Sequence, residues 1–186
     1  MAVFTVIHAP KKYHDPRAYY DLINYVLNPV KSPSFCAGSR GVSLNQAAFE
    51  MECLSQLWNK NRGLHLRHMV LSFDPIEEIT PHMAYKIGMQ AIEYYGSCYQ
   101  ILFAVHENTG HLHIHMVMNT VNYHTGPKYP GDKADYHRFI AHLQKILSSY
   151  DIDVIPARYS GIYEHSQSSI MYTAQWRSVL TLHHLN

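Results

Sequence analysis

Polar and apolar residues alternate without a break over residues 111–119, which read HLHIHMVMN. Alternation with a period of two is typical of a β-strand that buries one face. The face that should meet the core is apolar and consists of Leu112, Ile114, Met116 and Met118. The opposite face consists of His111, His113, His115, Val117 and Asn119. Three imidazoles in a row are unusual for a sheet face that is merely solvated.

A second strand is predicted just upstream at residues 99–106, and the turn residues ENTG between the two favour an antiparallel hairpin. A four-residue loop would place His106 opposite His111, with His113 on the diagonal, whereas a six-residue loop would place it opposite His113, with His115 on the diagonal. Opposed residues lie about 5 Å apart and diagonal ones about 7–8 Å. In either register three imidazoles can converge on one divalent ion. The alternatives are a metal-free catalytic histidine cluster and an exposed sheet face without function.

The same patterns divide the rest of the chain into short elements. Further strands are expected at residues 2–8, 67–73 and, from a weaker pattern, 153–155. Helices are expected at residues 17–26, 43–58, 80–95, 134–149 and, near the end of the chain, 172–181, while residues 30–43 read as a loop. Helix starts are marked by Asp15-Pro16, Thr80-Pro81 and a capping box that begins at Ser43. A mainly antiparallel sheet with its helices collected on one face predicts an α+β fold.

Composition adds limits rather than a function. The 186 residues suffice for one domain with a real core, of which the last residues, about 30 of them, are weakly assigned. A formal net charge of +1 is not the basic balance of a strong duplex-DNA binder, although it leaves room for a local basic groove. Three cysteines without a CxxC pair suggest neither a zinc ribbon nor a disulfide framework. Without a signal-peptide pattern or an apolar run of about 18 residues, we expect a cytoplasmic protein with no membrane insertion.

Several motifs, taken in order, resemble those of relaxases, the mobilisation nucleases of the HUH endonuclease superfamily. The histidine signature reads His106, six residues, His113-Ile114-His115, three residues and Asn119. Upstream, residues 23–31 (INYVLNPVK) look like the family's nucleophilic tyrosine followed by NPxK, and RHMVLSF looks like its second motif, a strand that ends in Ser-Phe. Residues 78–81 and 126–129 match as well, so the resemblance covers about residues 1 to 157.

The order of the motifs separates relaxases from their relatives. Replication initiators and small transposases of the superfamily carry the tyrosine after the histidine pair, whereas Tyr25 precedes it. Tyr13, Tyr19 and Tyr20 are competing nucleophiles nearby in the sequence. One position departs from the family: Asn108 stands where an acid two residues after the first histidine is usual.

The resemblance implies that one DNA strand is nicked and rejoined at an origin of transfer, by attack of the Tyr25 hydroxyl and retention of the 5′ phosphate. His106, His113 and His115 would bind a divalent ion, whose identity (Mn, Mg, Zn or Ni) the ligand set leaves open. His111 is a candidate general base. The substrate would be single-stranded DNA in a cleft on the histidine face of the sheet, and the partners an accessory origin-binding protein and a coupling protein.

Further residues are candidates for weaker roles. The candidate DNA contacts are Lys31, Ser72, Lys128 and Tyr129, because cationic and aromatic side chains hold phosphates and bases. Asn119 and Asn108 are candidates for orienting a ligand imidazole.

Two other classes of function remain open at this stage. The run HLHIHMV also fits the histidine-triad nucleotide hydrolases, in which His113 would attack a nucleotide phosphate without a metal. A non-catalytic DNA-binding accessory domain is the other alternative.

Overall fold

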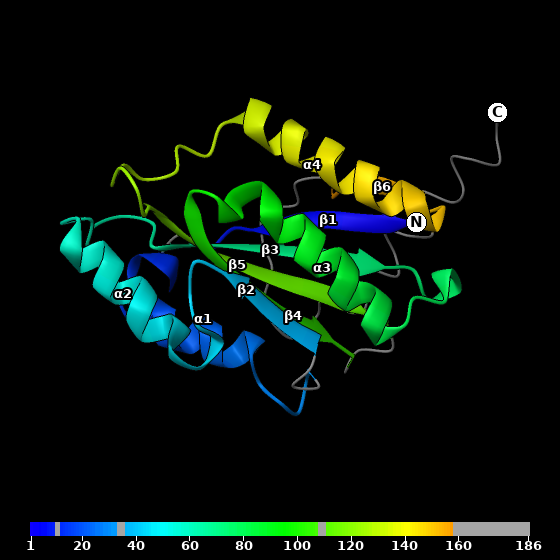
Figure 1. Cartoon of the computed structure of the whole chain (residues 1–186), viewed down its shortest axis with the longest axis horizontal. Helices are drawn as coiled ribbons and strands as arrows, with labels where there is room; N and C mark the ends of the chain where they lie inside the picture. The colour runs from blue at the N-terminus through cyan, green and yellow to red at the C-terminus, as the bar shows by residue number, and fades with distance from the viewer. Residues whose placement is uncertain (10–11, 33–35, 108–110, 158–186) are drawn as a thin grey trace.

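The computed structural model describes residues 1–9, 12–32, 36–107 and 111–157, which form a six-stranded sheet (Figure 1). Along the chain the strands are β1 (Ala2–Ile7), β2 (Ala37–Arg40), β3 (Leu66–Phe73), β4 (Tyr99–His106), β5 (His113–Asn122) and β6 (Val154–Pro156). They lie in the order β2-β4-β5-β3-β1-β6, and all neighbours are antiparallel except β1 and β6. The α+β class and the mainly antiparallel sheet are therefore confirmed.

The helices are α1 (Ala18–Val26), α2 (Ala47–Leu57), α3 (Pro81–Gly96) and α4 (Lys133–Leu147). A side chain caps the start of α3 and of α4, whereas α1 and α2 begin without a side-chain cap. The Thr80 hydroxyl accepts from the Met83 amide at 3.2 Å, which caps α3 before its first-turn proline. The capping box at Ser43 does not form: its amide donates to Glu50 instead, and a short 3-10 turn precedes α2.

Helices cover both faces of the sheet, not one. Side chains of α3 and α4 pack with Leu71, Phe103 and Met116 in a large core, and Figure 1 shows these two helices together on one side of the sheet. On the opposite face α1 and α2 pack over Leu102 and Val117 in a second core. The expectation of helices on one face is therefore correct only for α3 and α4. The reason is that α1 has an apolar stripe, which must be buried and packs on the apolar half of the other sheet face. The stripe consists of Tyr19, Leu22, Ile23 and Val26.

Strand β2 was expected to be a loop, because its residues AGSR are small or polar rather than β-branched. It nevertheless pairs with β4 at the edge of the sheet. Gly38 explains the placement, since a Cβ there would lie 2.6 Å from the Met89 sulfur and 2.7 Å from the Phe103 ring. The absence of a side chain lets this strand lie close beneath α3.

The central hairpin fixes the register that the sequence left open. His106 pairs with His113 and Ala104 with His115, which confirms the register of the six-residue loop. On the other side of β5, Ser72 pairs with His113 and Val70 with His115. The histidines therefore lie in the middle of the sheet, on the face that carries α1 and α2.

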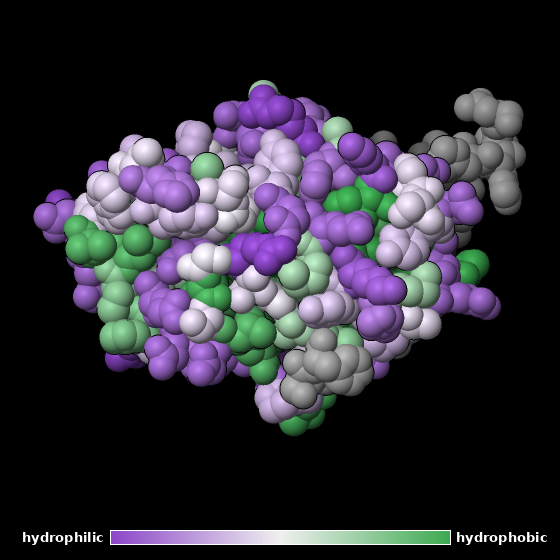
Figure 2. All heavy atoms as spheres, viewed as in Figure 1, coloured by the Kyte–Doolittle hydropathy of each residue, from purple (hydrophilic) through white to green (hydrophobic). Residues whose placement is uncertain are grey.

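The surface of the described residues is mixed. Figure 2 shows a largely hydrophilic face over α3 and α4 and a group of hydrophobic residues over α2, where Phe49 and Leu57 are exposed. Among the residues described, no helix combines the length and apolar character needed to cross a membrane. The helix predicted at residues 172–181 lies outside the described residues.

Candidate metal and nucleophile site

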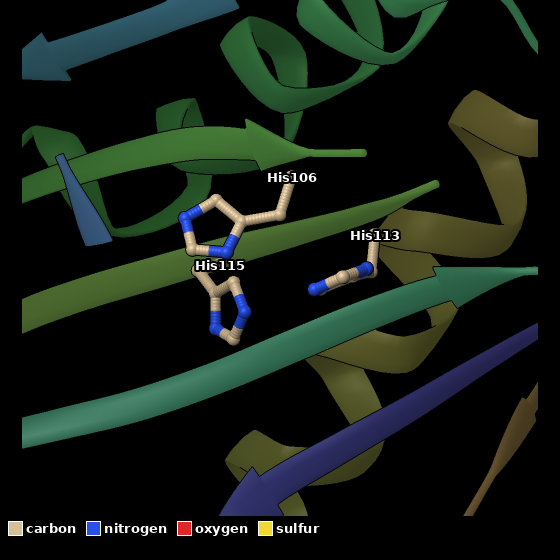
Figure 3. A group of neighbouring side chains, drawn as sticks. All are labelled: His106, His113 and His115. Carbon is tan, nitrogen blue, oxygen red and sulfur yellow. The ribbon is translucent and has the colours of Figure 1, made fainter. Parts of the chain in front are cut away.

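Three buried histidines point their imidazoles at one another across the hairpin (Figure 3). His106 is the last residue of β4, and His113 and His115 lie on β5. One ring nitrogen from each lies within 4.8 Å of the other two. The hairpin thus brings together the three histidines that the family resemblance gives as metal ligands.

The protein backbone sets the tautomer of two of these imidazoles. His106 Nε2 donates to the Val26 carbonyl at 2.8 Å, so its proton is on Nε2 and the lone pair is on Nδ1. His113 Nδ1 donates to the His111 carbonyl at 3.2 Å, which places its lone pair on Nε2. A carbonyl oxygen only accepts, and each of these two ligands is therefore held in the form that can bind a metal.

The third imidazole is held by another side chain. His115 Nδ1 lies 2.8 Å from His68 Nε2. The other nitrogen of His115, Nε2, and Nδ1 of His106 are buried and have no hydrogen-bond partner among the described residues. Such atoms cost about 1–3 kcal/mol each unless something binds them. Unpartnered, converging imidazole nitrogens fit zinc, nickel, cobalt or manganese better than magnesium.

Burial keeps these imidazoles neutral. It lowers the pKa of His113 to about 4, with smaller contributions from the neighbouring histidines and Lys31. Burial is also the main cause of the lowered pKa of His106 and of His115. Because a metal binds the neutral imidazole, the three residues are ready to act as ligands at neutral pH.

Tyr25 lies beside the histidines in the last turn of α1. Its ring centroid is 5.7 Å from that of His106 and 5.6 Å from that of His115. The Val26 carbonyl that accepts from His106 belongs to the next residue, so the C-terminal end of α1 is tied to the histidine site. The Lys31 ammonium lies 3.9 Å from the centre of the Tyr25 ring. Burial raises the pKa of Tyr25, which leaves the phenol protonated at neutral pH.

The three competing tyrosines have other environments. Tyr13 and Tyr19 are 2% and 1% exposed, and the Tyr19 hydroxyl hydrogen-bonds Ser55 at 2.6 Å. Tyr20 is exposed and donates to Glu52 at 2.8 Å. Of these four tyrosines, Tyr25 alone is both partly exposed and in ring contact with the ligands.

Two more predicted residues belong to this site. Ser72 pairs with His113 across the strands and so shares the histidine face, where it is 2% exposed. His111 lies 5.8 Å from His113, centroid to centroid, and its carbonyl orients that ligand. His111 is not one of the three converging histidines. Asn108 lies outside the described residues.

Lys128 and Tyr129 lie at the far end of β5. Lys128 bridges to Val121, six residues beyond His115, which corresponds to about 20 Å along the strand. Its ammonium donates to the carbonyls of Arg62 and Leu64 at 2.7 and 2.8 Å. The Tyr129 hydroxyl donates to Asp135 on α4. As DNA contacts these two residues stay predictions, and they lie apart from the histidines.

Asn119, the candidate for orienting an imidazole, makes its hydrogen bonds elsewhere. The Asn119 amide donates to the Met51 carbonyl and to Gln100, both at 3.0 Å, and so supports the packing of α2 rather than a ligand imidazole. The sequence does hold a signal for His68, which was not among the predicted site residues, because its position in RHMVLSF is in phase with Ser72. It holds no signal for the Val26 carbonyl.

The chain is similar to known relaxases over most of its length. Residues 25–152 match the family model "Relaxase: MobA/VirD2-like, nuclease domain". The "Group II intron-interrupted relaxase LtrB" of Lactococcus lactis subsp. cremoris (strain MG1363) is 28% identical over 159 residues, which cover 75% of this chain and 26% of that protein. "Protein rlx" of Staphylococcus aureus is 22% identical over 128 residues, covering 69% of this chain and 38% of that protein.

A solved structure described as "Molecular Basis of Vancomycin Resistance Transfer in Staphylococcus aureus" aligns with a TM-score of 0.46 at 10% identity, over 66% of this chain and 74% of that one. The chain spans between about a quarter and two fifths of the length of the two curated relatives named above. Among the classes that the sequence left open, the family match favours the relaxase. This chain belongs to the relaxase family, as a nuclease domain of the MobA/VirD2-like type.

Proposed function

We propose that this chain nicks and rejoins one strand of DNA at an origin of transfer, with Tyr25 as the nucleophile and a divalent ion on His106, His113 and His115. One observation carries the proposal. The partly exposed phenol of Tyr25 lies beside three buried histidines whose ligating nitrogens converge.

The reaction is a transesterification. The Tyr25 oxygen attacks the phosphorus of a phosphodiester, the bond from phosphorus to the 3′ oxygen breaks, and the 5′ phosphate stays on the tyrosine. The phenol loses a proton and the departing 3′ oxygen gains one, so the reverse reaction rejoins the strand without another energy source. A bound divalent ion would supply positive charge that neutralises the phosphate oxygens.

The residues of the chain supply the rest. Burial raises the pKa of Tyr25, so its proton must be removed as it attacks, and His111 is our candidate base. The Lys31 ammonium over the Tyr25 ring adds positive charge where the anionic phosphate would lie. Ser72, opposite His113, offers a hydroxyl to the same phosphate.

Single-stranded DNA is the proposed substrate, because the tyrosine has to reach an unpaired backbone. An accessory origin-binding protein and a coupling protein are the proposed partners, by family alone, and the proposed location is the cytoplasm.

The test is covalent trapping. The protein is incubated with an origin-derived single strand and manganese, separated under denaturing conditions, and the adduct is mapped to a peptide. We expect a 5′-phosphotyrosyl adduct on Tyr25, and Tyr25→Phe should form none while it still folds and binds metal.

Tyr20→Phe is the matched control, because it removes a hydroxyl from the same helix that is exposed and donates to Glu52 rather than facing the histidines. It should form the adduct at the wild-type rate. An adduct on another tyrosine would reject the nucleophile but keep the reaction. DNA binding with no adduct under any ion would indicate an accessory domain instead.

A further inference from the structure

A line of buried hydrogen bonds runs from His115 away from the site. His115 Nδ1 lies 2.8 Å from His68 Nε2, and His68 Nδ1 lies 2.9 Å from the Tyr13 hydroxyl. The exposed fractions are 6%, 2% and 2% for His115, His68 and Tyr13. The line therefore connects a ligand to a tyrosine that is too deeply buried to be a nucleophile.

Three elements that are distant in the sequence build this line. Tyr13 lies in the 3-10 turn Lys12–His14 before α1, and His68 lies on β3. The Tyr13 carbonyl accepts from the His65 amide at 2.9 Å, which ties that turn to the start of β3. His68 pairs with Val117 on β5, two residues from His115 on the same face. The geometry is thus fixed by the fold.

His115 differs from the other two ligands in the kind of partner it has. His106 and His113 face carbonyl oxygens, which only accept, so their tautomers are fixed. His115 faces an imidazole, which can donate or accept, and beyond it a hydroxyl, which can do either too. Two directions of the line are therefore compatible with the same heavy-atom positions.

The direction decides what His115 offers to a metal. In one, His115 Nδ1 donates to His68 Nε2, His68 Nδ1 donates to the Tyr13 oxygen, and the lone pair of His115 is on Nε2. In the other, Tyr13 donates to His68, His68 donates to His115 Nδ1, and the proton of His115 is on Nε2. Only the first direction leaves Nε2, a buried nitrogen with no hydrogen-bond partner among the described residues, able to coordinate an ion.

We propose that His68 and Tyr13 are positioning residues that set the tautomer of His115, and through it the affinity of the site for its divalent ion. This rests on the proposed metal site. Hydrogen-bond partners of ligating histidines typically contribute about 10–100-fold to metal affinity. Because the imidazole of His68 can either donate or accept, the binding of an ion can select the direction of hydrogen bonding that frees the lone pair of His115 Nε2.

The first test is metal affinity, measured by calorimetric titration of manganese or zinc into the metal-free full chain. His68→Leu should weaken binding by about 10–100-fold, since nothing would then accept from His115 Nδ1. His68→Gln should recover most of the loss, because its amide oxygen can accept that proton. Tyr13→Phe should lose less than His68→Leu, because it removes only the end of the line.

A neighbouring tyrosine–histidine pair provides matched controls. Tyr19 and His65 are 1% exposed each, with 3.3 Å between the hydroxyl and Nδ1. In the part of the chain that the structure describes, no hydrogen bond or ring contact joins this pair to His106, His113 or His115. His65→Leu and Tyr19→Phe should therefore leave metal affinity unchanged, whatever they do to stability. A loss of affinity equal to that of the line's variants would mean that packing, not hydrogen bonding, is responsible, and would overturn the proposal.

The second test reads the tautomers directly in the wild-type chain, by imidazole nitrogen NMR with zinc bound. We expect protons on Nδ1 of both His68 and His115. A proton on Nε2 of His68 in the zinc-bound chain, or wild-type affinity in His68→Leu, would overturn the proposal.

Adduct formation separates this inference from the proposed function. In His68→Leu the ion concentration for half-maximal adduct should rise, while the rate at saturating ion stays near wild type. If the wild type binds an ion and His68→Leu weakens it, but no adduct ever forms, the line of hydrogen bonds stands and the nicking activity fails. If the wild type binds no ion, both the metal site and this inference fail.

Discussion

One face of the sheet has two unlike ends. Toward α2, Leu102 and Val117 are covered by helices, and the buried amide of Asn119 donates both of its hydrogens, to Met51 and Gln100. Toward the hairpin loop, the same strands carry imidazoles, and His106 Nδ1 and His115 Nε2 are buried with no hydrogen-bond partner in the described part of the chain.

The difference shows how a buried polar group that stabilises the fold can be distinguished from one that awaits a ligand. A polar group whose hydrogen bonds are complete stabilises the packing around it, whereas a buried polar atom left incomplete lowers stability unless a ligand binds it. The end near α2 therefore stabilises the fold, whereas the histidine end carries buried polar atoms that lower stability unless the proposed ion binds them. Substitutions at the two ends should have opposite consequences.

The largest effect should come from His113→Leu. Removal of one of three ligands should weaken zinc or manganese binding by more than the roughly 100-fold typical of an outer hydrogen-bond partner. The metal-free chain should unfold at the same denaturant concentration as wild type or a higher one, because an apolar side chain replaces a buried imidazole whose carbonyl partner is 3.2 Å away. Calorimetry and urea unfolding measure the two quantities. A large loss of metal-free stability would contradict the comparison.

The converse change is Asn119→Leu. It should lower the free energy of unfolding by about 1–3 kcal/mol, since the Met51 carbonyl and the Gln100 side chain lose their donor in a buried place. Metal affinity should not change, because Asn119 is not a ligand and does not touch one. A loss of affinity in the folded variant would show that the two ends are coupled.

The sequence predicted the hairpin and its three histidines because both are local. Two neighbouring strands and the turn between them hold His106, His113 and His115, and the predicted cap at Thr80 starts a helix where expected. Strand β2 could not be predicted in this way, because its pairing depends on the room that Gly38 leaves beneath α3.

The surroundings of the ligands could not be predicted from local patterns. His68 is 47 residues from His115 in the sequence, and Val26 is 80 residues from His106. Only the folded sheet brings these groups together, and a backbone carbonyl has no sequence signature at all. The second layer of helices was missed for a different reason: the apolar stripe of α1 shows that it must be buried, but not on which face.

Acid should affect the histidine end before the other end. Burial holds the pKa of His113 at about 4, below the ordinary value of 6.5 that it has in the unfolded chain. Between these two values the unfolded chain is protonated at His113 and the folded chain is not. The stability that depends on a neutral His113 is therefore complete above pH 6.5 and is lost as the pH falls toward 4. The metal-free wild type should lose about 1 kcal/mol through His113 at pH 5.5.

The control for this pH effect is His113→Leu, which cannot bind the proton. The difference in unfolding free energy between the two chains, measured by urea titration at pH 7.5 and at pH 5.5, isolates the single residue. A difference that does not change with pH would show that His113 is already protonated, or equally solvated, in both states.

The smallest effect compares two lysines at the two ends. Lys31 lies over Tyr25 beside the histidines, whereas the Lys128 ammonium is held by the carbonyls of Arg62 and Leu64. If Lys31 neutralises one phosphate of the bound strand, Lys31→Met should reduce the slope of log affinity against log salt by about 0.7, the value for one contact to single-stranded DNA. Lys128→Met should leave the slope unchanged and instead lower stability by about 1 kcal/mol, through the two carbonyls it releases. Fluorescence anisotropy with a labelled origin strand, over a series of salt concentrations, measures both variants. An equal reduction by Lys128→Met would show that the strand runs the length of β5 and contacts both ends of the sheet.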